Sequence, residues 1–147
     1  MRLPGFSRLG VVREKSKGQS LVEFAIVLPV FLWLVMGIAD FGRGIASYAL
    51  VANCAREGAR AGIFSGTTFP TGQEDAQIVA AVNSQTLFLG TLPSSDVTIT
   101  PEPQTARSSG SNITVTVTYH FTPITPLISS AVGSVITMTA SSTMLIE

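Results

Sequence analysis

The stretch that decides the fold is Gly18-Gln19-Ser20-Leu21-Val22-Glu23, followed by an uncharged run over residues 24–39. The run holds sixteen residues, and at about 1.5 Å per residue a helix of that length spans about 24 Å, slightly less than the ~30 Å core of a bilayer. Starting at Leu21 and including Glu23, the segment reaches nineteen residues, close to the ~20 required. The stretch therefore predicts a transmembrane helix with a costly carboxylate at its threshold.

Charge is distributed unevenly on either side of this run. Only 12% of the 147 residues are charged, about half of the ~25% typical of a soluble domain. Residues 1–17 carry five cations against Glu14, a net charge of +4, and the remainder carries −4. The cation bias predicts a cytoplasmic N-terminus and an external C-terminus. The four other arginines form no basic stripe, which argues against nucleic acid as a partner.

A helical pattern continues beyond Asp40. Apolar residues recur there at steps of three and four, at Phe41, Ile45, Tyr48, Val51 or Ala52, and Ala55. The pattern predicts a helix from Gln19 to about Gly62, the last third of which leaves the membrane. Pro29 removes one backbone hydrogen bond from this helix, and a membrane segment tolerates the resulting kink better than a soluble helix does.

The end of this helix carries two packing features. Gly58 and Gly62 have the GxxxG spacing that allows close helix packing, either against another subunit or against the chain's own domain. Arg56, Glu57 and Arg60 lie on the same stretch, and Glu57 and Arg60 have the i,i+3 spacing of an ion pair. This charged face is interpreted either as a solvated surface or as a docking surface for a neighbouring subunit.

A second helix follows a Gly- and Pro-rich loop at residues 65–72. Thr71 and Glu74 have the spacing of a capping box, and Gly90 is placed to end the helix. Its buried stripe is expected at Ala76, Val79, Val82 or Ala81, Thr86 and Leu89. This helix is predicted to dock against a sheet.

After Pro93 the apolar period changes from 3.6 to 2. The alternation predicts strands at residues 97–99, 113–122 and 135–146, with a helical turn or two at residues 127–132. Three strands with one apolar face need a cover. We therefore predict an α+β fold, in which a long N-terminal hydrophobic helix continues into a small domain with a second helix and a three-stranded antiparallel sheet.

Candidate chemical groups are few. Cys54, the sole cysteine, lies in an Ala-rich helical turn, where a packing role is expected. His120, the sole histidine, lies on the threonine face of a strand with no acidic residue beside it. Neither a catalytic pair nor a Cys/His metal cluster can be assembled. We expect no enzymatic activity, no cofactor, no metal and no small-molecule substrate.

Glu23 is the residue that needs a functional explanation. A carboxylate in the first turns of a membrane helix either reaches back to the interface or pairs with a cation. If the mature chain began at Gln19, its α-amine would be such a cation at neutral pH. It would lie one helical turn from Glu23, and a staggered neighbouring subunit could supply an equivalent amine.

These residues resemble the TadE-like family of pseudopilins, accessory subunits of the tight-adherence (Flp-type) pilus machinery. The resemblance rests on Lys17-Gly18-Gln19-Ser20-Leu21-Val22-Glu23-Phe24-Ala25, on Pro29 and on Ala55-Arg56-Glu57-Gly58-Ala59-Arg60-Ala61. It implies cleavage by a prepilin peptidase after Gly18, retention of the helix in the inner membrane and packing against other pilin helices, with Glu23 matching the family's glutamate near the mature terminus. Gln19 departs from the aromatic residue common at the mature terminus of other type IV pilin classes, which leaves N-methylation open.

Together these features predict a basic leader at residues 1–18, a transmembrane and assembly helix at 19–40 and an extracytoplasmic domain at 41–147. The predicted function is that of a single-pass minor pilin or pseudopilin of the bacterial inner membrane, acting in assembly of a tight-adherence pilus for surface attachment. Its expected partners are the prepilin peptidase, other pilin subunits and membrane lipid. The alternative is a secreted or periplasmic binding domain with a conventional signal peptide cut near Ala39, or with an uncleaved anchor, although Gly37-Ile38-Ala39 is a poor cleavage site.

Overall fold

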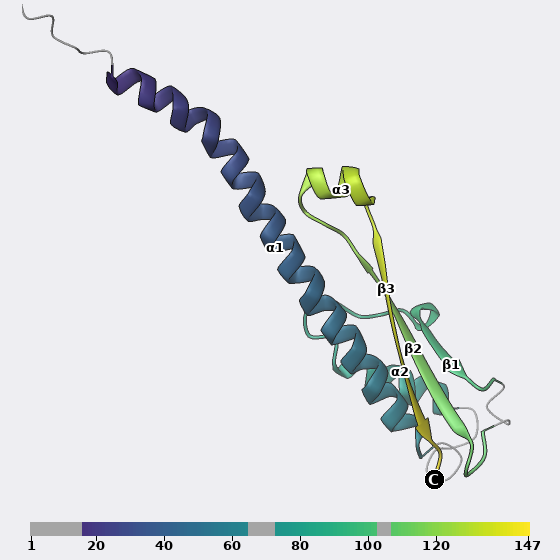
Figure 1. The fold of residues 1–147 in the computed structure, drawn as a ribbon. Helices are drawn as coiled ribbons and strands as arrows, with labels where there is room; N and C mark the ends of the chain where they lie inside the picture. Colours follow the sequence, from purple (N-terminus) through teal and green to yellow (C-terminus); the bar gives the residue numbers. More distant parts are fainter. Residues whose placement is uncertain (1–15, 65–72, 103–106) are drawn as a thin grey trace, which may run out of the picture. The chain divides into compact units, whose positions relative to one another are not determined.

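The computed structural model describes residues 16–64, 73–102 and 107–147 (Figure 1). Most of the predicted leader, and Thr71 of the predicted capping box, lie outside the described residues. The helices and strands follow in the order α1 (Ser16–Gly62), α2 (Glu74–Ser84), the 3-10 helix η1 (Ser94–Asp96), β1 (Val97–Thr100), β2 (Asn112–Phe121), α3 (Pro126–Val132) and β3 (Ile136–Leu145). The chain divides into two compact units, one ending at Val35 and one beginning at Met36.

The first unit contains the N-terminal part of α1. The helix passes through Pro29 without interruption, and every side chain from residue 18 to residue 35 is exposed. The segment is long and apolar enough to cross a membrane. A helix that is apolar on all sides requires an apolar environment, either lipid or other helices.

The second unit is the predicted α+β domain, with the sheet order β1-β2-β3. Both strand pairs are antiparallel, and Val117 of β2 lies opposite Val97 of β1 and Ala140 of β3. One face of β2 is buried through Ile113, Val115 and Val117, and the threonines between them are partly exposed. The alternation of apolar and polar residues in β2 arises because alternate side chains of a strand face the core.

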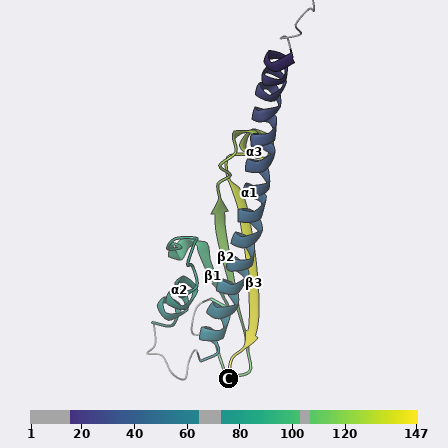
Figure 2. The same cartoon turned by 90° about the vertical axis from the view of Figure 1, so that its left-hand side faces the viewer.

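The C-terminal part of α1 and helix α2 supply the cover for this face. Val51, Cys54, Ala55 and Ala59 of α1 join the strand residues in one buried cluster, to which α2 contributes Ile78 and Val82. Figure 2 shows α2 beside the C-terminal turns of α1. The predicted fold class is therefore confirmed.

Two details of α2 differ from the prediction. The predicted stripe agrees at Val82 and Thr86 but differs at its start, where Ile78 is buried and Ala76 is exposed. The helix also ends at Ser84 rather than near Gly90. Asn83 explains the early end, since its side chain donates a hydrogen bond to the Leu92 carbonyl (3.1 Å) and accepts one from the Leu92 amide (2.8 Å). These two bonds hold Leu92 beside the end of α2, so the chain loops back between Asn83 and Leu92, a stretch that includes Gly90 with a φ of +75°.

Candidate functional site

The residues of the predicted processing and pairing site lie on the first turns of α1. Gln19 and Glu23 are both exposed, and the Gln19 side-chain amide donates a hydrogen bond to Glu23 Oε1 at 3.2 Å. The two residues therefore share one helix face, one turn apart. Gly18 lies directly before them, and a Cβ built on it would meet nothing within 4 Å.

Asp40 ends the uncharged run and belongs to the second unit, where its side chain is buried. Its Oδ1 accepts a hydrogen bond from the Ile124 amide at 3.1 Å, and its Oδ2 accepts one from the Thr125 amide at 2.6 Å. Arg43 completes the arrangement by donating to Oδ1 at 3.0 Å. Thr125 is the N-cap residue of α3, so Asp40 fixes the start of α3 to α1.

Arg43 extends this arrangement to the sheet. Its guanidinium lies 5.3 Å from the centroid of the Phe121 ring, at the end of β2. The sequence pattern predicted that the helix continues through Asp40, but it did not predict this role. The available signal was the first charge after a long uncharged run, but its partners lie 84 and 85 positions away along the chain.

An apolar groove opens beside this carboxylate, within the second unit. Its cavity has a volume of about 460 Å³. It is lined by Phe41, Ile45 and Tyr48 of α1, Phe121 of β2, Ile128 and Val132 of α3 and Met138 of β3, together with Asp40, Gly44, Pro123 and Ile136. Because the walls come from four separate elements, the groove could not be recognised from any single stretch of sequence.

The glycines of the predicted packing motif face their own domain. A Cβ on Gly58 would lie 2.6 Å from Val82 Cγ2 and 3.0 Å from Val115 Cγ1, and one on Gly62 would lie 2.6 Å from Ile113 Cδ1. Both glycines allow close approach of α1 to α2 and the sheet, and the constraint is tighter at Gly58, because its neighbours are stiff valine side chains whereas the terminal methyl group of Ile113 near Gly62 can move. Of the two packing partners left open by the sequence, the fold uses its own domain.

The charged residues next to these glycines, Arg56, Glu57 and Arg60, lie outside the buried core cluster. Arg60 Nη2 and Glu57 Oε1 form an ion pair at 3.2 Å, and the Arg56 guanidinium donates to Asn53 Oδ1 at 3.3 Å. Arg56 and Arg60 are exposed on this helix face, and Glu57 is partly exposed. Exposed pairs of this kind contribute about 0–1 kcal/mol to stability.

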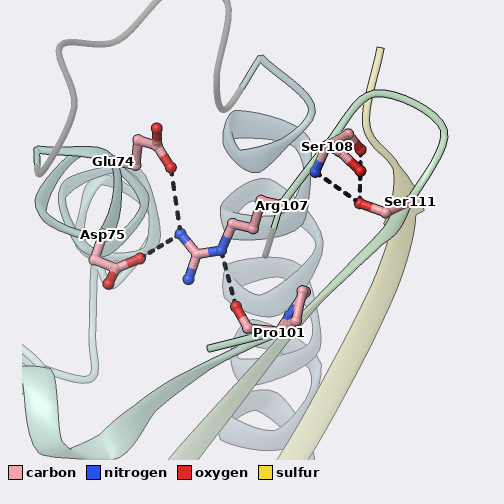
Figure 3. Close-up of polar contacts among 6 residues, drawn as sticks. All are labelled: Glu74, Asp75, Pro101, Arg107, Ser108 and Ser111. Atoms are coloured by element: carbon pink, nitrogen blue, oxygen red, sulfur yellow. Dashed lines mark hydrogen bonds and ion pairs between the residues drawn. The ribbon is translucent and has the colours of Figure 1, made fainter. Parts of the chain in front are cut away.

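A buried arginine forms a second polar cluster (Figure 3). Arg107 Nη1 lies 2.6 Å from Asp75 Oδ1 and 3.6 Å from Glu74 Oε2, and its Nε donates to the Pro101 carbonyl at 3.1 Å. Nearby, Ser111 Oγ accepts from the Ser108 amide. Arg107 ties the start of α2 to the chain that joins β1 and β2, and this role was not predicted.

The two residues considered for chemistry, Cys54 and His120, lie in different environments. Cys54 is fully buried in the core, and burial raises the pKa of its thiol, which disfavours the reactive thiolate. His120 is exposed, with its Nδ1 3.4 Å from Thr137 Oγ1. Across residues 16–64, 73–102 and 107–147, no group of three or more His, Cys, Asp or Glu side chains could hold a metal ion.

Comparison with known protein families gives one match. The model of the family described as TadE-like protein matches residues 18–60. The matched segment includes Gly18, Gln19 and Glu23 at one end and Gly58 and Arg60 at the other, and it confirms the resemblance predicted from these motifs. Comparison with curated proteins and with solved structures found no match.

Proposed function

We propose that this chain, TadE-like over residues 18–60, is a membrane-anchored minor pilin or pseudopilin that acts in assembly of a tight-adherence pilus. The observation that carries this proposal is that Gln19 and Glu23 lie one turn apart at the start of an apolar helical segment that is exposed throughout residues 18–35. TadE-like proteins are structural components of a pilus system, which agrees with a long apolar helix near the N-terminus.

Processing would convert this arrangement into a charge pair. Cleavage of the Gly18–Gln19 bond by a prepilin peptidase would leave an α-amine on Gln19, cationic at neutral pH. In the intact chain, the Gln19 side chain already reaches Glu23. The new amine would lie on the same turn, or the amine of a neighbouring subunit would occupy an equivalent place, and either would neutralise a carboxylate that is costly in a membrane.

Assembly would then proceed through the exposed helix. Residues 21–39 would lie in the inner membrane, with the N-terminus cytoplasmic and the domain on the other side. Their side chains can contact lipid or the helices of other pilin subunits. Arg56, Glu57 and Arg60 offer an outward charged face on the same helix, which suits contact with a second subunit outside the membrane.

The mature N-terminus tests the proposal. Intact-mass measurement and N-terminal sequencing of the chain recovered from membranes should show that it begins at Gln19, and deletion of the prepilin peptidase should restore the full-length mass. Gly18→Leu should block cleavage, whereas Gly42→Leu, at another open glycine position on α1, should be processed normally. A chain that begins at Asp40 would instead support the secreted-domain alternative and overturn the proposal.

A further inference from the structure

The connection between β2 and β3 carries no charged residue. From Ser108 to Ile146 the sequence contains no Asp, Glu, Lys or Arg. This stretch includes residues 124–135, which comprise α3 and its flanks and are called here the membrane-contact segment. Its large side chains Ile124 and Val132 are each 64% exposed, and Val135 is 49% exposed.

The contacts of this segment place it level with the end of the uncharged run. Gly37 lies in the last turn of that run, and a Cβ on Gly37 would lie 4.0 Å from Ile128 Cδ1 of α3. Asp40, immediately after the run, accepts the Ile124 and Thr125 amides. All of these residues belong to the second unit. A membrane boundary near Ala39 would therefore coincide with α3.

The polar groups near the end of the uncharged run, Asp40 and Arg43, have partners that suit a site with little water. Backbone amides without partners are expensive in lipid, and Asp40 supplies the acceptors for two of them while its own side chain is buried. Arg43 is half exposed and lies over the Phe121 ring, so that it can extend its guanidinium towards headgroups.

The groove between α1 and α3 adjoins the membrane-contact segment. Phe41 and Ile45 on its rim are 71% and 57% exposed, and they extend the apolar surface of α1 by about two turns beyond Ala39. Contiguous exposed apolar surface of this kind marks an interaction site. Its occupant follows from its position, since a groove that adjoins the end of a membrane span meets lipid first.

We propose that the membrane-contact segment lies in the lipid–water boundary on the domain's side of the membrane, and that the groove holds a phospholipid acyl chain. This inference rests on the proposed function, because it requires α1 to span the bilayer. It adds a second anchoring element, which fixes the domain against the membrane surface before assembly. A helix of another subunit is the competing occupant.

Depth measurements on the full-length chain in phospholipid vesicles test this inference. In a Cys54→Ala background, single cysteines replace Ile124 or Val132 and carry an environment-sensitive fluorophore. Phe88, an apolar residue of the same domain that is 87% exposed, provides the matched control position. Phe31, within the uncharged run, reports whether α1 is inserted. Fluorescence is quenched either by aqueous iodide or by lipids with a nitroxide on the upper acyl chain.

The inference expects labels at 124 and 132 to be quenched by the lipid nitroxide and to be several-fold less accessible to iodide than the label at 88. Iodide quenching equal to that at 88, with the label at 31 shielded, would overturn the membrane contact and leave the proposed span intact. Iodide quenching of the label at 31 would overturn both the membrane contact and the proposed membrane span. Shielding at 132 that increases with the protein-to-lipid ratio, without nitroxide quenching, would overturn lipid as the occupant in favour of a second chain.

Discussion

Glu23 and Asp40 lie at the two ends of the uncharged run, and their surroundings differ. Asp40 is buried, and its oxygens accept hydrogen bonds from two amides and from Arg43. The charge of Asp40 is therefore already paired within the folded domain. Glu23 is exposed, and it accepts a hydrogen bond from the neutral side chain of Gln19. Its charge therefore remains available for a partner that arrives with processing or assembly.

The substitution Glu23→Gln should separate assembly from folding. Glutamine keeps the shape and a hydrogen bond to Gln19 but removes the charge, so membrane insertion should be unchanged or improved. A hydrogen bond to a charged group is worth about 1.5–3 kcal/mol, which corresponds to roughly ten- to hundredfold weaker association. Quantifying the chain in sheared pili, and in complexes with other pilin subunits, measures this loss.

The matched control is Asp96→Asn, which removes the same charge from the domain surface and should leave assembly unchanged. Normal piliation in the Glu23→Gln strain would contradict the role assigned to this carboxylate.

How far single residues could be predicted depended on where their partners lie. Glu23 could be proposed as a site residue because its immediate neighbours are apolar, which makes a carboxylate there costly. Asp40 and Arg107 could not, because Asp40 contacts Ile124 across 84 positions and Arg107 contacts Asp75 across 32. Such long-range contacts are set by the tertiary fold, and no local period encodes them.

Helix α1 is open to its surroundings at Gly42 and closely packed against the domain at Gly58. A Cβ added at Gly42 would meet nothing within 4 Å, whereas one at Gly58 would clash with Val82 and press on Val115. The GxxxG spacing correctly predicted close packing but could not identify the partner.

Periodicity likewise predicted α1, β2 and β3 well, but not the end of α2, where the Asn83 side chain turns the chain.

The contrast between Gly42 and Gly58 predicts opposite effects of the same substitution on one helix. Gly42→Ala should raise the free energy of unfolding by up to about 1 kcal/mol, the difference in helix propensity. Gly58→Ala should lower it, because overpacking against the stiff Val82 and Val115 side chains costs about 1–3 kcal/mol and outweighs that gain. Chemical denaturation of both variants in detergent, followed by circular dichroism, gives the comparison. Equal stability of the two variants would refute close packing at Gly58.

At the scale of the whole molecule, the buried core lies in the second unit, whereas residues 18–35 of the first unit are all exposed. Every residue of the buried core cluster lies between Val51 and Ile146, inside the unit that begins at Met36. The fold class was predictable because the period changes from 3.6 to 2 after Pro93. The groove was not, because it exists only where α3 is held against α1.

A chain that begins at Met36 should therefore fold without the membrane span but keep its affinity for lipid. Circular dichroism should show the helices and the sheet, and flotation with phospholipid vesicles should show reversible binding. Burial of one isoleucine side chain is worth about 1.5–3 kcal/mol, so Ile124→Lys should weaken vesicle binding roughly ten- to hundredfold. Leu87→Lys, at an apolar position that is 80% exposed, should leave it unchanged. An unfolded Met36 chain would show that the core depends on the span, and a folded chain that ignores vesicles would show that the domain has no membrane contact of its own.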